Sequence, residues 1–140
     1  MRTMRSSDSA IVALVGYAAD GRGHGVAYAR ATGARTRQLL RVGFRSAARP
    51  SSDRAIAYGA LTAIAQALVK RGVREVRFVL GDAQFADEIA TGRGVGETLA
   101  IPYVRLRCVL NSLAKFSVQA GVTDDLTQRA RAEVALNVAA

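Results

Sequence analysis

The chain has 140 residues, of which 50% are hydrophobic, 22% charged and only 6% aromatic. That length is enough for one packed core but not for two. Twenty Lys and Arg against eleven Asp and Glu give a net charge of +9, which favours a polyanionic partner, nucleic acid before a membrane surface. The sequence has no apolar run of about 18 residues, so a transmembrane helix is excluded. A single cysteine excludes a scaffold held by internal disulfides.

The chain is predicted to form one domain over residues 10–140, preceded by a flexible basic leader over residues 1–9. The leader carries no signal-peptide cleavage site, so the cytoplasm is the expected location. Residues 10–18 form a continuous apolar run rich in β-branched side chains, which predicts a central strand buried on both faces. Residues 26–32 and 37–45 alternate in polarity after short turns. Together the three runs predict an antiparallel meander.

The hydrophobic period then changes to that of a helix. Ser52 or Asp53 is positioned to cap a helix that ends at Gly72. The run over 75–80 predicts a fourth strand, parallel to a neighbour because a helical crossover leads to it. The remaining expected elements are a helix over 83–91, a helix over 99–113, a strand over 115–120 and a last helix capped by Asp124 or Asp125. The order βββαβαα(β)α predicts an α/β domain with a mixed sheet.

This order resembles that of the ribonuclease H fold, and three strings resemble motifs of that family. The string Ser52-Asp53-Arg54-Ala55-Ile56 is similar to the family's Asn-Asn-Arg-x-Glu. Residues 81–89, followed by Gly92, resemble its Asp-Ser-Gln run. Residues 125–132 resemble its Asn-x-x-Ala-Asp-x-Leu-Ala helix. The resemblance covers roughly residues 10–138 and implies a ribonuclease H-like mixed sheet.

The resemblance also implies a nuclease chemistry that this sequence supports poorly. Ribonuclease H cleaves a phosphodiester with two divalent ions held by about four carboxylates. Asp20 is the only candidate for the first carboxylate; if it lies in the turn, the strand position falls on Gly16 or Ala18. The second position falls on Ile56 or Ala57. Asp82 matches the third, and the fourth falls on Arg129, a reversal of charge.

The expected site is therefore degenerate, and no cofactor is expected. The alternative is an active, divergent nuclease that uses Mg²⁺ or Mn²⁺, with Asp20 and Asp82 as catalytic candidates. Asp82, Asp20 and Asp125 are then the candidate metal ligands, with Asp87 as a further substitute. Each acid also has a structural interpretation, because Asp82 and Asp125 lie where helices begin and caps are needed. His24 has no spaced partner for a metal site, and Cys108 is expected to be buried and inert.

The arginines give the stronger functional signal. The five that fall on the third strand, its flanking turn and the first loop are predicted to line one phosphate-tracking groove: Arg22, Arg41, Arg45, Arg49 and Arg54. The alternative is that the strand arginines only cover a sheet face with their apolar stems. The few aromatic residues fall mostly on apolar faces, so contacts with RNA, DNA or a hybrid are expected to be independent of sequence.

Three functions follow from these observations. The favoured one is an inactive ribonuclease H-like domain that binds nucleic acid through its backbone. The second is the metal-dependent nuclease. The third is a structural or partner-binding module, including a homo-oligomer, with an apolar interface on the helix over 97–113.

Overall fold

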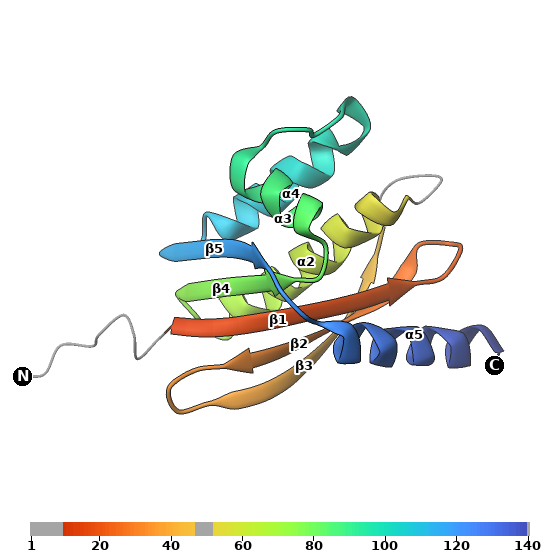
Figure 1. The fold of residues 1–140 in the computed structure, drawn as a ribbon, viewed down its shortest axis with the longest axis horizontal. Coiled ribbons are helices and arrows are strands. Elements are labelled where there is room, and N and C mark those ends of the chain that lie inside the picture. The colour runs from red at the N-terminus through yellow and green to blue at the C-terminus, as the bar shows by residue number, and fades with distance from the viewer. Residues whose placement is uncertain (1–9, 47–51, 140) are drawn as a thin grey trace, which may run out of the picture.

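A computed structural model describes residues 10–46 and 52–139 (Figure 1). The leader over residues 1–9 and the candidate Arg49 lie outside the described residues. Five strands form one sheet in the order β3-β2-β1-β4-β5. They are β1 (Ala10–Ala19), β2 (His24–Thr32), β3 (Arg37–Arg45), β4 (Glu75–Leu80) and β5 (Lys115–Ala120). The first three strands are antiparallel, and β4 pairs parallel with both β1 and β5.

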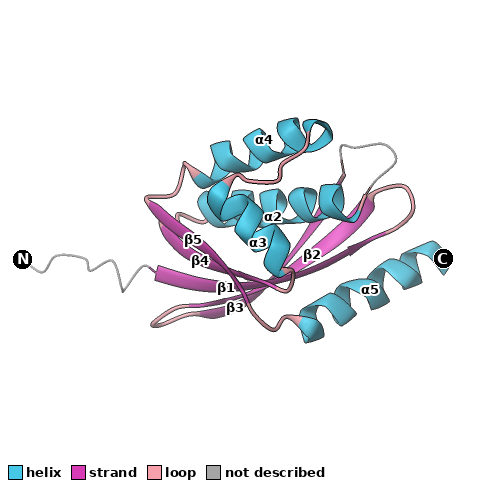
Figure 2. Cartoon of the chain, turned by 45° about the horizontal axis from the view of Figure 1, so that its top comes forward, coloured by secondary structure: helices cyan, strands magenta, loops and turns pink. Residues whose placement is uncertain are grey.

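Helices lie on both faces of this sheet (Figure 2). One face carries α2 (Asp53–Lys70), α3 (Ala83–Thr91) and α4 (Ala100–Leu110), the last preceded by the 3-10 turn η1 (Glu97–Leu99). The other face carries α5 (Asp124–Ala139). The predicted order of strands and helices is confirmed, including the fifth strand. Within the described part of the chain, no helix has both the length and the apolar character that crossing a bilayer requires.

The alternation of β1 divides the core between the two faces. Ala13 and Val15 pack with Leu61, Phe78 and other side chains beneath α2, α3 and α4. Leu14 and Ala18, which point the other way, pack in a smaller cluster formed by Val26, Tyr28, Leu126 and Ala130 beneath α5. The prediction of a central strand is therefore confirmed, but burial on both faces is not: most side chains of β1 on the α5 side are only partly buried.

Local sequence explains where several elements begin and end. Ser52 caps α2, because its hydroxyl accepts a hydrogen bond from the backbone N–H of Ala55 at 3.1 Å. Gly72, with φ of 81°, stops the chain from continuing as a helix. β2 begins two residues earlier than predicted, because His24 still pairs with Arg45 of β3. α5 begins at Asp124, so neither Asp124 nor Asp125 is the cap; both lie in its first turn.

Candidate nucleic-acid interface

An open cavity of about 850 Å³ lies where β1 and β4 end. Its walls come from the end of β1, the start of α2, the β4–α3 turn and the start of α5. The side chains that matter for its chemistry are Tyr17, Asp53, Arg54, Ile56, Asp82, Asp124, Thr127 and Arg131. Because parallel strands end here, this edge is where ligand sites of α/β proteins usually lie. We call this cavity the strand-end cleft.

Asp82 is engaged on both of its oxygens. Oδ1 accepts a hydrogen bond from the backbone N–H of Phe85 at 3.0 Å and so caps α3. Oδ2 lies 3.6 Å from Nη2 of Arg54. The cap predicted from the sequence is confirmed, and the ion pair is an addition to it. A cationic side chain thus lies beside the carboxylate.

Arg54 is held in place from a second side. Its Nη1 donates to Oε1 of Glu88 at 2.9 Å, and the hydroxyl of Tyr58 donates to the other oxygen of Glu88. Burial, followed by the hydrogen bond to Glu88, raises the pKa of Tyr58 well above its usual range. The Arg54 guanidinium also lies 5.2 Å from the centre of the Phe85 ring. The Asp82–Arg54–Glu88–Tyr58 network therefore fixes the arginine as part of the protein's own structure.

The carboxylate candidate on the first strand does not reach the cleft. Asp20 lies in the β1–β2 turn, where Oδ1 accepts hydrogen bonds from the backbone N–H groups of Arg22 (2.8 Å) and His24 (3.0 Å). It lines a different cavity, so the pair Asp20 and Asp82 proposed for the nuclease alternative is not brought together. The strand position is left to Gly16 or Ala18, neither of which carries a metal-binding group.

Two expectations about α5 are wrong. Arg129 does not line the strand-end cleft; its guanidinium lies 5.1 Å from the centre of the Tyr28 ring, on β2. Thr127 and Arg131 line the cleft instead. Asp125 also lies outside the cleft and pairs with Arg30 at 2.8 Å, which holds the pKa of this carboxyl below its usual range.

The residues of the cleft do not fit a pair of divalent ions. Asp53, Asp82 and Asp124 line it, but within the described residues no three or more His, Cys, Asp or Glu side chains gather closely enough to hold a metal ion. Ile56, one of the two helix positions that the resemblance aligns with a carboxylate, also lines the cleft. Two arginines share the space. Two Mg²⁺ ions need several converging oxygen ligands to offset their charge. The three carboxylates of this cleft do not converge, and one of them, Asp82, is paired with Arg54.

The structure distributes the predicted arginines over three cavities instead of one groove. Arg22 and Arg41 line a cavity of about 690 Å³ between the β1–β2 turn and the end of α5. Arg54 lines the strand-end cleft. Arg45 lines a third cavity, of about 270 Å³, between β3, α2 and α4. The proposed role of these residues in binding stays a prediction.

Arg41 is tied to a partner that the sequence does not indicate. Its Nε lies 3.0 Å and 2.7 Å from the two oxygens of Glu133 on α5, and its Nη2 and the Tyr28 hydroxyl also donate to this carboxylate. The bond from Arg41 and then that from Tyr28 lower the pKa of Glu133 to about 2. Arg41 therefore fastens α5 to the sheet, and of the described candidates Arg22 and Arg45 remain exposed without a described carboxylate partner.

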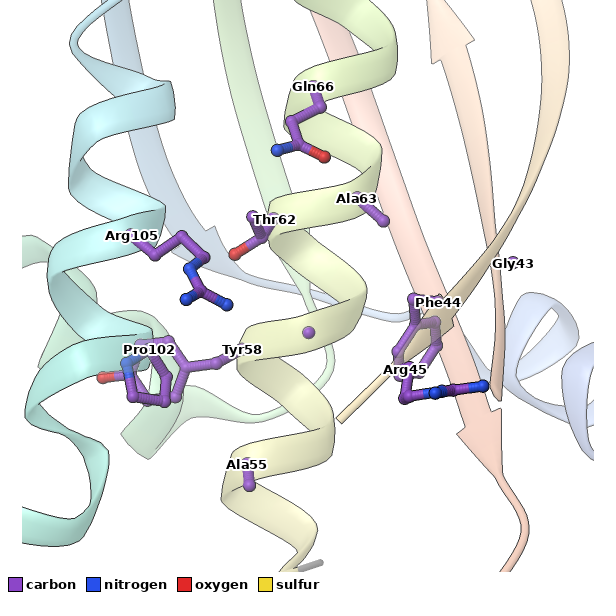
Figure 3. A pocket seen from close by; sticks show the side chains of 11 residues that line it. Gly43, Phe44, Arg45, Ala55, Tyr58, Thr62, Ala63, Gln66, Pro102 and Arg105 are labelled. Carbon is purple, nitrogen blue, oxygen red and sulfur yellow. The ribbon is translucent and has the colours of Figure 1, made fainter. Parts of the chain in front are cut away.

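The third cavity contains a cation that sequence analysis missed. Figure 3 shows Arg105 reaching from α4 toward α2, with Arg45 on the far side of α2. Tyr58 and Pro102 form one wall and Phe44 another. No local motif marks Arg105, because the cavity exists only once α4 has packed against α2.

Cys108 is exposed, so the expectation that it is buried is wrong. The buried positions of α4 are Leu106 and Leu110, which are four residues apart and share one face of the helix. Cys108 falls halfway between them and faces outward, as do Ile101 and Val104. His24 is exposed at the start of β2.

The comparisons with known proteins agree with this architecture. No family model matches the sequence, and no curated protein matches it significantly. Solved structures do match over nearly the whole chain. The N-terminal ribonuclease H domain of Rv2228c from Mycobacterium tuberculosis has a TM-score of 0.71 at 15% identity and covers 92% of this chain and 98% of its own. Ribonuclease H1 of the archaeon Halobacterium salinarum has a TM-score of 0.70 at 18% identity, covering 91% and 98%.

A third match is LC11-RNase H1, solved in complex with an RNA/DNA hybrid, with a TM-score of 0.66 at 14% identity and coverage of 87% and 91%. The chain therefore has the ribonuclease H fold, as its order of elements predicted. At sequence identities this low, the similarity establishes the fold and nothing about activity.

Proposed function

We propose that this chain is a nucleic-acid-binding domain that holds RNA, DNA or a hybrid by phosphate contacts, independent of base sequence and without two-metal cleavage. One observation carries the second half of this proposal: Asp82, the remaining acid among the family's metal positions, is paired with Arg54 at 3.6 Å. Without bound divalent ions, the chain would act on a polyanion only by binding it with its positively charged surface.

Support for binding comes from charge and from fold. The net charge of +9 attracts a polyanion at long range. Arg22 and Arg45 extend into solvent from the β1–β2 turn and the end of β3. A protein with the same fold, LC11-RNase H1, was solved with an RNA/DNA hybrid. We extend that binding mode to this chain as part of the proposal.

No cofactor is required by the proposed function. A divalent ion would be needed by the nuclease alternative alone, and it would have to displace the Arg54 guanidinium from Asp82. Displacement is unfavourable because Arg54 also satisfies Glu88, which is largely buried. Localisation in the cytoplasm and the absence of a membrane partner remain part of the proposal.

The test is a paired assay on a labelled RNA/DNA hybrid, single strands and duplexes. Binding is measured by fluorescence anisotropy over a salt series, and cleavage in Mg²⁺ and in Mn²⁺. We expect affinity that falls steeply with salt and no divalent-ion-dependent product. The double variant Arg22→Gln/Arg45→Gln should weaken binding of the hybrid several-fold more than Lys70→Gln/Arg71→Gln, which removes the same charge from exposed positions at the end of α2.

Two results contradict the proposal. Product formation in a divalent ion that disappears in Asp82→Asn would establish the nuclease alternative. A chain that binds no nucleic acid at low salt would remove the binding function.

A second function is favoured by one specific feature, the exposed side of α4. Ile101 and Val104 are 69% and 57% exposed on this helix, which the sequence marked as a candidate interface. An interaction module or homo-oligomer would bury this side. Sedimentation of the intact chain tests it: a concentration-dependent dimer that is lost in Ile101→Lys/Val104→Lys supports the module, and a monomer at all concentrations removes it.

A further inference from the structure

One half of the sheet is left open on the α5 side. α5 starts beyond the end of β5 and packs on β1 and β2 where Leu126 and Ala130 meet Val26 and Tyr28. Figure 1 shows α5 along the half of the sheet where β1 ends, and no helix of the described chain on this side where β1 begins. Several side chains of that first half are exposed, among them those of Arg37, Arg77 and Ser117.

A row of cross-strand neighbours runs over all five strands of this open half. The register joins Arg37 to Thr32, Thr32 to Val12, Val12 to Arg77 and Arg77 to Ser117. Residues that lie directly opposite one another in a sheet project from the same face. Arg37, Arg77 and Ser117 are exposed, and Thr32 and Val12 are partly so. We call this surface the open sheet face.

Its charge is predominantly positive. Lys115 lies two residues before Ser117 on β5 and so adds a third exposed cation to the face. One acidic residue lies next to these cations: Glu75 of β4, which is directly opposite Lys115 of β5. In the described part of the chain, no ion pair ties Arg37, Arg77 or Lys115 to a carboxylate within 4 Å. Three cations on one surface, without a carboxylate partner among the described residues, repel one another, and a bound polyanion would relieve that repulsion.

The shape of the face selects among polyanions. It is a sheet surface without a covering helix among the described residues, and it spans four inter-strand spacings, about 19 Å. The face also carries apolar side chains, the partly exposed Val12 from β1 and Leu39, which is 44% exposed, from β3. In a duplex the bases are paired and stacked, so their faces cannot contact these apolar side chains. A single strand presents both phosphates and unstacked bases, and an exposed sheet is a known platform for such strands.

We propose that the open sheet face binds single-stranded nucleic acid, with phosphates on Arg37, Arg77 and Lys115 and bases against its aliphatic side chains. The inference rests on the proposed function, because it takes nucleic-acid binding as given. It adds that single strands bind a surface separate from the strand-end cleft. The proposed contacts involve three cations and no aromatic ring. The charge of the nucleic-acid backbone therefore dominates the affinity, and the preference among bases is weak.

The test compares two triple variants that each lower the net charge from +9 to +6. Arg37→Gln/Arg77→Gln/Lys115→Gln removes the cations of the face. Lys70→Gln/Arg71→Gln/Arg93→Gln removes three exposed cations elsewhere. The probes are a labelled 12-nucleotide oligo-uridine and a blunt RNA/DNA hybrid, in anisotropy titrations over a salt series, with circular dichroism to verify folding.

The face variant should bind oligo-uridine at least about tenfold more weakly, with the slope of log affinity against log salt reduced by about 2, because each lost phosphate contact on a single strand contributes about 0.7. Its affinity for the hybrid should match that of the control variant. The proposal is overturned if the two triple variants bind oligo-uridine equally. It is also overturned if poly-glutamate competes as well as oligo-uridine, which would assign the face to an acidic protein.

The two probes distinguish failure of the open sheet face as a binding site from failure of the proposed function as a whole. A chain that binds the hybrid but not oligo-uridine loses the open sheet face as a site and keeps the function. A chain that binds neither probe loses both.

Discussion

A Cβ atom added to Gly16 would lie 2.5 Å from the backbone nitrogen of Thr127. α5 therefore packs directly on the backbone of β1 at one of the two strand positions left for a metal-binding carboxylate once Asp20 is placed in the turn. No side chain fits there while the helix keeps its place. A carboxylate introduced at this position would therefore collide with the backbone of α5.

The first prediction concerns this close approach. Gly16→Ala should destabilise the chain by about 1–3 kcal/mol, the usual cost of overpacking a well-packed site, and Gly16→Asp by more, since a charge would be buried as well. Urea unfolding followed by circular dichroism measures both. Gly21→Ala is the matched control, because nothing lies within 4 Å of a Cβ added there. Equal stability of the Gly16→Ala and Gly21→Ala variants would show that α5 can move away freely.

The second prediction separates the two roles of Asp82. As a helix cap it accepts a hydrogen bond from the backbone of Phe85, and an asparagine can do the same. Asp82→Asn should therefore cost less than about 0.5 kcal/mol and Asp82→Ala about 1 kcal/mol. Thermal unfolding of the two variants checks this order. If the asparagine variant were as unstable as the alanine variant, the ion pair with Arg54 would be the dominant contribution.

Local chemistry was sufficient to predict most of the elements. The alternation of Leu40, Val42 and Phe44 gave the correct face of β3, and the capping residue Ser52 gave the start of α2. These features depend on neighbours within a few residues. Gly16 carried a signal that was not used: a glycine inside a buried β-branched strand marks a place where another backbone approaches closely.

The side-chain network of the site depends on distant residues and could not be predicted in this way. Arg41 and Glu133 are 92 residues apart, and nothing in either segment points to the other. The choice of Arg129 over Thr127 was an error of register in α5. Two residues turn a helix by about 200°, so the expected cleft residue instead faces Tyr28.

A third prediction addresses the buried end of the Arg54 network. Arg54→Met leaves the largely buried Glu88 without its cation, which should cost about 1–3 kcal/mol. Adding Glu88→Gln removes the uncompensated charge, so the double variant should be more stable than the sum of the single variants implies. A double-mutant cycle by urea unfolding measures the coupling. Additive effects would show that the two side chains act independently.

The fourth prediction is a pH dependence that originates at Glu133. Its pKa in the folded chain is about 2, below the value of an unfolded glutamate, chiefly because Arg41 donates to it. A lowered pKa means that this pair stabilises the fold above the unfolded pKa, near 4.3, and that the contribution is lost as pH falls toward 2. The free energy of unfolding should therefore decline more steeply from pH 5 to pH 2 in the parent chain than in Glu133→Gln.

Urea titrations at several pH values give these slopes, and Asp87→Asn, at an exposed acid of α3, is the control. Identical slopes for the parent chain and Glu133→Gln would mean that the contact between α5 and β3 contributes no pH dependence.

The last prediction uses Cys108 to examine the exposed side of α4. Because the thiol is exposed on the side opposite Leu106 and Leu110, a thiol-specific reagent should modify one cysteine per chain in the native state without denaturant. If α4 pairs with a second copy through Ile101 and Val104, the rate of modification should fall as protein concentration rises, and Ile101→Lys should abolish that fall. A rate independent of concentration, with full modification, would leave the α4 side free in solution and remove the oligomeric alternative. Modification only in denaturant at every concentration would contradict the exposure of the cysteine itself.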